Sequence, residues 1–114
     1  MPKRRVKRGL IVAKIKPGSE DKVAAIFAKS DQTELPELAG VKHRSLFVLD
    51  DVYVHYVETE EDFELAVDAV RQNELFKEIS RELDAYITPY DPETWKSPKD
   101  ATAREFYTWD SDSE

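Results

Sequence analysis

The sequence predicts an α+β fold in which strands and helices follow the order β-α-β-β-α-β. Three observations lead to this class. Residues 6–16 would place apolar and β-branched side chains on both faces of a strand, as in a central strand. Residues 41–50 and 52–59 alternate between apolar and polar side chains on either side of a short acidic turn. Helical periodicity flanks this pair. A length of 114 residues suits one core, so we expect residues 1–114 to form a single domain.

The first strand is followed by the sequence PGSEDK, which predicts a turn and then a helix. Ser19 is a favourable N-cap, and the acidic residues after it suit the positive end of the helix dipole. Four residues at helical spacing predict a helix that ends near residue 30: Val23, Ile26, Phe27 and Ser30. Pro36 and Gly40 in the segment TELPELAG disfavour further helix, so we expect an exit loop there.

Residues 41–59 predict a β-hairpin with a two-residue Asp-Asp turn. In this register Leu46 lies opposite His55, and Arg44 lies diagonally from His55. The face with Arg44, Tyr53 and His55 mixes polar and apolar groups, so we expect it to be open to a small molecule. The other face is mostly apolar, and we expect the helices to cover it: Val41, His43, Ser45, Phe47, Leu49, Val52, Val54 and Tyr56.

The second half predicts two helices, a long loop and a closing strand. Phe63, Ala66, Val67 and Val70 form one apolar stripe, and Asn73 caps a further helix that buries Phe76, Ile79 and Leu83. The proline-rich residues 85–102 predict the loop, and residues 104–110 the last strand. This order is the ferredoxin-like plan, a four-stranded antiparallel sheet with helices on one face. We expect residues 1–5 to be a flexible basic arm and residues 111–114 a flexible tail.

Composition excludes several classes of function. The net charge of −7 argues against general nucleic-acid binding, although the PKRRVKR start is either a phosphate-binding arm or simply a solvated one. The chain has no cysteine, which excludes disulfides and thiolate metal sites. No apolar run approaches the roughly 20 residues of a membrane span, and no signal-peptide core follows the basic start. We therefore expect a cytoplasmic protein with no membrane partner.

Asp31, Arg44 and His55 stand out because charged and imidazole side chains beside apolar strands usually have a structural or functional role. Each also has an ordinary explanation. Asp31 would cap a turn, Arg44 would form an interface ion pair, and His55 would be a satisfied, partly buried residue. Tyr53 suits a strand in any case. No metal site is predicted, because His43 and His55 point to opposite faces.

Four motifs together resemble the small aromatic polyketide cyclases. They are D-x-T-E-L-P from Asp31, D-x-Y-x-H ending at His55, Y-x-T-P-Y at residues 86–90 and F-Y-x-W at residues 106–109. The resemblance extends from about residue 8 to residue 110. It implies a ferredoxin-like fold, a homodimer formed through the sheet, a cavity between helices and sheet or at the open face, and no cofactor. The implied substrate is an aromatic polyketide intermediate, free or bound to a carrier protein.

The resemblance also implies roles for individual residues. Such a cyclase, of lyase or isomerase type, performs a late aldol cyclisation with loss of water in bacterial type II pathways to antibiotics or pigments. His55, with an ordinary pKa of about 6.5, would transfer protons. Arg44 would stabilise the enolate or alkoxide, and Asp31 would orient His55 or act as a second base. Tyr53 and Ser30 would contact the substrate, although the family's type member has histidine in place of Ser30.

Two other functions fit the same fold. One is a cofactor-independent oxygenase that converts an anthrone to a quinone. The other is a non-catalytic module of a polyketide pathway that binds ligands or assists the synthase. Fold alone does not separate these from the cyclase.

Overall fold

The structure is a computed structural model that describes residues 7–91, 93, 101–109 and 111, without the side chains of Phe63 and Glu64. The expected basic arm at residues 1–5 and the end of the expected tail, residues 112–114, lie outside the described residues, as does the predicted packing of Phe63.

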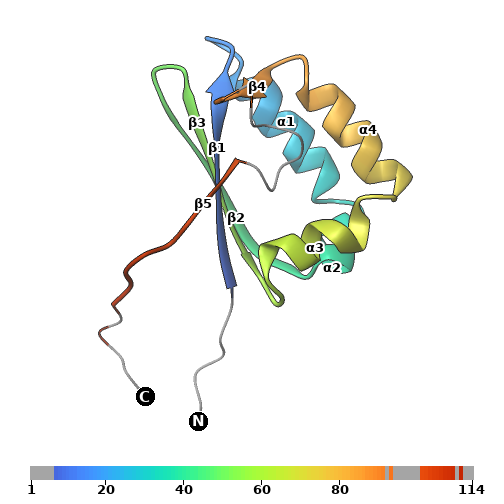
Figure 1. The fold of residues 1–114 in the computed structure, drawn as a ribbon. Helices are drawn as coiled ribbons and strands as arrows, with labels where there is room; N and C mark the ends of the chain where they lie inside the picture. Colours follow the sequence, from blue (N-terminus) through green and yellow to red (C-terminus); the bar gives the residue numbers. More distant parts are fainter. Residues whose placement is uncertain (1–6, 92, 94–100, 110, 112–114) are drawn as a thin grey trace.

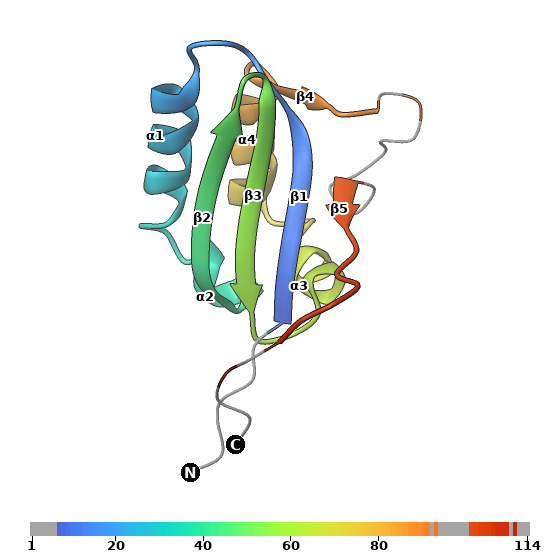
Figure 2. The same cartoon turned by 90° about the vertical axis from the view of Figure 1, so that its left-hand side faces the viewer.

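One antiparallel sheet carries helices on one of its faces (Figure 1). The strands are β1 (Lys7–Ile15), β2 (Val41–Leu49), β3 (Val52–Thr59), β4 (Ile87–Pro89) and β5 (Thr102–Ala103). The helices are α1 (Glu20–Ser30), α2 (Leu35–Ala39), α3 (Phe63–Val70) and α4 (Glu74–Leu83). The strand order is β2-β3-β1-β4, and β5 also pairs with β1 (Figure 2). The α+β class, the central first strand and the ferredoxin-like order are confirmed.

The predicted closing strand at residues 104–110 is wrong. Two short strands pair with β1 instead, and one of them, β4, lies within the predicted long loop. Residues 104–109 are exposed and have no regular structure. Side-chain hydrogen bonds, rather than a backbone ladder, connect this segment to β1. Arg8 Nη2 donates to Glu105 Oε2 at 2.9 Å and to Thr108 Oγ1 at 2.8 Å.

The predicted exit loop after α1 contains the short helix α2, which the sequence analysis missed. Pro36 lies in the first turn of α2, where its missing N–H has no intrahelical partner to lose. Gly40 ends the helix in the left-handed conformation, with φ of 72°. Both residues thus mark the ends of a helix rather than its absence.

The hairpin register is confirmed, but its faces were assigned the wrong way round. Leu46 lies opposite His55, as predicted. However, β1 pairs its buried Ile11 with His55 and its buried Ala13 with Tyr53, and directly paired residues share a face. The helices therefore cover the Arg44–His55 face, while Phe47 and Leu49 on the other face are exposed. The predicted placement followed the hairpin alone, whereas β1 decides which face enters the core.

Two apolar clusters join the layers. The first connects the sheet to α1 and contains Ala13, Ile15, Val23, Phe27 and Tyr53. The second takes one buried residue from each helix: Ile26, Leu35, Val70 and Ile79. Because the second cluster holds the helices to one another, part of the sheet face beneath them is not filled by their side chains.

The two predicted N-caps differ in the structure. The Asn73 side chain accepts a hydrogen bond of 2.8 Å from the backbone N–H of Leu75 at the start of α4. Ser19 occupies the same position before α1, but its side chain makes no capping hydrogen bond.

We therefore expect Asn73→Ala to lower the free energy of unfolding by about 1 kcal/mol, because it removes a real cap. Ser19→Ala is the matched control and should cost clearly less. Urea unfolding followed by circular dichroism measures both values. Equal losses in the two variants would contradict the assignment of the Asn73 cap.

Candidate active site

A cavity of about 380 Å³ lies between the helix-covered face of the sheet and the helices. Its volume falls within the range of small-molecule sites. Most of its wall is apolar and comes from β1, β3 and all four helices. The polar residues that line it are Ser30, Arg44, Tyr53, His55, Thr59, Ser80 and Asp84. A ligand of this cavity would thus have a largely apolar body and a few polar groups.

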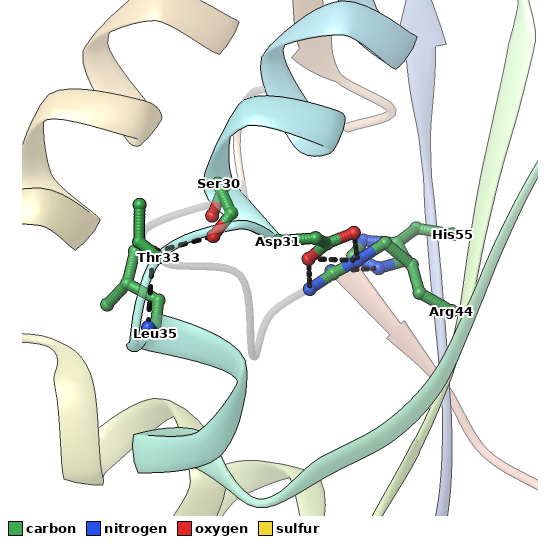
Figure 3. Close-up of polar contacts among 6 residues, drawn as sticks. All are labelled: Ser30, Asp31, Thr33, Leu35, Arg44 and His55. Atoms are coloured by element: carbon green, nitrogen blue, oxygen red, sulfur yellow. Dashed lines mark hydrogen bonds and ion pairs between the residues drawn. The ribbon is translucent and has the colours of Figure 1, made fainter.

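Asp31, Arg44 and His55 form one chain of polar contacts (Figure 3). Arg44 Nη2 donates to Asp31 Oδ1 at 2.8 Å, and Nε donates to Oδ2 at 3.1 Å, which gives a two-pronged pair. On its other side, Arg44 Nη1 lies 3.0 Å from His55 Nε2. Asp31 follows the last residue of α1, Arg44 lies on β2 and His55 on β3. The fold therefore brings together the three residues that the sequence predicted.

Phe27 of α1 supports this chain from the apolar side. The Arg44 guanidinium carbon lies 4.9 Å from the centre of the Phe27 ring, close enough for a cation–π contact. The Phe27 and His55 rings meet edge to face at 5.0 Å. Both Arg44 and His55 are thus fixed by packing as well as by hydrogen bonds.

His55 does not have the ordinary pKa expected from the sequence. Burial, and then the positive charge of Arg44, lower the pKa of His55 to about 3. The imidazole is therefore neutral at physiological pH. Because a guanidinium can only donate, Nε2 of His55 is the acceptor of the Arg44 bond, and Nδ1 carries the proton.

Arg44 keeps donors for a ligand. A guanidinium has five N–H groups, and one on each of its three nitrogens points to Asp31 or His55. The other two N–H groups have no partner among the described residues, and Arg44 lines the cavity. A ligand oxygen in the cavity can accept from them.

The five predicted site residues do not have equal access to the cavity. Arg44, His55, Tyr53 and Ser30 line it, whereas Asp31 reaches it only through Arg44. The sequence analysis missed Thr59, Ser80 and Asp84. Thr59 could have been found, because it lies four residues after His55 on the same face of β3. Ser80 and Asp84 had no such signal, since nothing in the sequence of α4 shows that its C-terminal end borders a cavity.

His43 lies on the open face of the sheet, away from this site. Its Nε2 is 2.8 Å from Ser45 Oγ, so the prediction that His43 and His55 face opposite ways is confirmed. Among the residues that the structure describes, no group of three or more histidine, aspartate or glutamate side chains is placed to hold a metal ion. None of the helices in that part of the chain has the length and apolar character needed to cross a membrane.

Comparisons with known proteins agree with this architecture. The model of the polyketide synthesis cyclase family matches residues 7–110. Polyketide synthase CurG of Streptomyces cyaneus is 46% identical over 103 residues, which cover 90% of this chain and 96% of CurG. An uncharacterized protein of Streptomyces coelicolor is 45% identical over 102 residues, or 89% of this chain and 92% of that protein.

A solved structure gives the same result. The tetracenomycin F2 cyclase of Streptomyces glaucescens, described as a type-II polyketide cyclase, superposes with a TM-score of 0.84 at 37% identity, over 92% of this chain and 98% of the cyclase. Its sequence is 38% identical over 102 residues, which cover 90% of this chain and 93% of the cyclase. The α+β sheet, the cavity between sheet and helices and these relatives agree, and the chain belongs to the polyketide synthesis cyclase family.

Proposed function

We propose that the protein catalyses a late intramolecular aldol cyclisation and dehydration of an aromatic polyketide intermediate, without a cofactor, in a bacterial type II pathway. The observation that carries this proposal is Arg44, which is held by Asp31 and His55 at the wall of an apolar cavity. Family membership and the likeness to the tetracenomycin F2 cyclase support it.

Arg44 is the proposed electrostatic centre of the reaction. A methylene group between two ketones loses a proton, and negative charge develops on the enolate oxygen and later on the alkoxide. The two free N–H groups of Arg44 can donate to that oxygen in a site with mostly apolar walls, where such bonds are strong. The walls would also restrict a reactive chain to one folded conformation, which lowers the entropic part of the barrier.

His55 and Asp31 have different proposed roles beside Arg44. The neutral His55 accepts a bond from Arg44 at Nε2, and the same lone pair can take a proton from the substrate once Arg44 Nη1 turns to a ligand oxygen. The imidazolium so formed would lie beside a guanidinium, so His55 is a weak base and Arg44 must contribute much of the rate. Asp31 holds and orients Arg44 and balances its charge.

A homodimer formed through the open face of the sheet remains part of the proposal. This face exposes Phe47 and Leu49 from β2, with exposed fractions of 57% and 74%. A second copy that packs on this face would cover these side chains.

The function is tested by reconstitution with a minimal type II polyketide synthase, with and without the protein. We expect a new, further-cyclised product that is lighter by one water, detected by liquid chromatography and mass spectrometry. A product that has gained oxygen would contradict the cyclase and support the oxygenase. A profile of products identical to that without the protein would also count against the cyclase.

Arg44→Lys should lower the yield of this product on the order of 10²-fold, because an ammonium lacks the planar fork that holds Asp31 and His55 while donating to the ligand. Arg8→Lys is the matched control, since Arg8 lies on the same sheet but contacts Glu105 and Thr108. Product formation per folded protein gives the readout. Equal yields from the two variants would remove Arg44 from the mechanism.

The pKa of His55 predicts a loss of stability in mild acid. The unfolded chain binds a proton at His55 near the usual pKa of 6.5, whereas the folded chain does so only near pH 3. The free energy of unfolding should therefore fall as the pH drops from 6.5 towards 3, by up to about 1.4 kcal/mol per pH unit. Urea unfolding at pH 7 and pH 5 measures this slope.

His55→Gln should reduce the slope, because glutamine does not titrate and still offers an acceptor to Arg44. His43→Gln is the matched control and should leave the slope unchanged, since His43 is exposed on the open face. If both variants keep the slope of the unaltered protein, the neutral state assigned to His55 is wrong.

A further inference from the structure

Tyr53 contributes a phenol hydroxyl group to the wall of the cavity. The side chain lies on β3 beneath the helices, only 4% exposed, and it lines the cavity. Its hydroxyl makes no hydrogen bond to any described residue. Among the described residues, every side-chain nitrogen or oxygen that is cut off from solvent has a hydrogen-bond partner, so this hydroxyl is accessible from the cavity. An accessible phenol in a cavity wall, without a partner among the described residues, can donate a hydrogen bond to a ligand.

Tyr56, on the same strand, shows the contrast. It points to the open face, and its hydroxyl donates to Glu58 Oε2 at 2.6 Å. The unpaired state of Tyr53 is thus not a general property of the tyrosines in β3. It belongs to the residue that faces the cavity.

Tyr53 is also placed beside the residues proposed for catalysis. It precedes His55 by two positions on the same face, and the two ring centres are 6.4 Å apart. Burial raises the pKa of Tyr53, while the nearby charge of Arg44 acts in the opposite direction without cancelling the effect of burial. The phenol therefore keeps its proton at neutral pH.

Ser30 and Ser80 also line the cavity with hydroxyl groups that make no side-chain hydrogen bond to a described residue, and Ser30 is 5% exposed. A serine hydroxyl is a far weaker acid than a phenol, whose usual pKa is about 10. Of these three hydroxyl groups, the Tyr53 phenol is the one able to give up a proton to a strongly basic oxygen.

We propose that Tyr53 is the proton donor of the ring closure, an inference that depends on the proposed cyclase function. When the enolate carbon bonds to the ketone carbon, the carbonyl π pair moves to oxygen and forms an alkoxide. Tyr53 transfers its hydroxyl proton to this alkoxide, and the proton that His55 took from the methylene group returns to the phenolate through water. The hydroxyl group of the carbinol and a hydrogen of the neighbouring carbon then leave as water, and a carbon–carbon double bond forms with no oxidant or reductant.

The contact between Tyr53 and a ligand oxygen is tested with two matched probes. 1-Tetralone is a fused aromatic ketone, and tetralin is the same ring system without the oxygen. We expect Tyr53→Phe to weaken binding of 1-tetralone about 2- to 10-fold and to leave binding of tetralin unchanged, because only one neutral hydrogen bond is lost. Titrations followed by ¹H–¹⁵N NMR give the dissociation constants.

Tyr56→Phe is the matched control and should bind both probes as the unaltered protein does, since Tyr56 faces away from the cavity. If Tyr53→Phe binds 1-tetralone as tightly as Tyr56→Phe does, the Tyr53 hydroxyl does not meet a ligand oxygen and the proposal fails.

The proton transfer is tested in the reconstituted synthase. Tyr53→Phe should lower the yield of the dehydrated, cyclised product on the order of 10²-fold, the size of one general acid, while Tyr56→Phe retains it. Full yield from Tyr53→Phe would overturn the role of Tyr53 and leave the cyclase standing. If the unaltered protein gives no cyclised product, the cyclase function itself fails, and with it the role of Tyr53. The two failures are therefore distinguishable.

Discussion

The arrangement of this molecule depends on keeping one guanidinium in place at the wall of an apolar cavity. Arg44 needs a counter-charge, an acceptor and a flat apolar partner at once, and Asp31, His55 and Phe27 supply them. These partners come from both layers of the fold. Phe27 lies within α1 and Asp31 directly after it, whereas His55 lies on β3 of the sheet. The cluster therefore fixes the end of the first helix against the central part of the sheet. A charge so held is oriented before any ligand arrives, which is the condition for electrostatic stabilisation of a reaction.

The cavity exists because the helices pack on one another as well as on the sheet. Ile26, Leu35, Val70 and Ile79 form a helix-to-helix cluster, and the cavity lies between this layer and the strands. Every second residue of β3 faces the cavity, and Tyr53 and His55 are among these residues. The same alternation directs Tyr56 and its partner Glu58 to the open face. Successive side chains of β3 thus point alternately to the cavity and to the exterior.

Much of the fold could be predicted from local patterns, because those patterns record local physical constraints. The apolar stripe of α1, the Asn73 cap and the two-residue hairpin turn each depend on residues a few positions apart, and the structure contains them as predicted. The likeness to known cyclases likewise came from short motifs that include Asp31 and His55. Errors arose where a decision lay between distant segments. The closing strand was placed at residues 104–110, although the edge of β1 pairs with Ile87–Pro89 and Thr102–Ala103.

The sequence by itself determined the longer elements β1, β2, β3, α1, α3 and α4 and the hairpin register. It also identified the residues to examine: Arg44, His55, Tyr53, Ser30 and Asp31. Only the tertiary structure decided which face of the sheet the helices cover, because that choice depends on how β1 pairs with β3 and not on the hairpin's own composition. It also decided the protonation of His55, since burial and the charge of Arg44 are absent from an isolated strand. The chain carries the chemical groups, and packing sets their environment and therefore their reactivity.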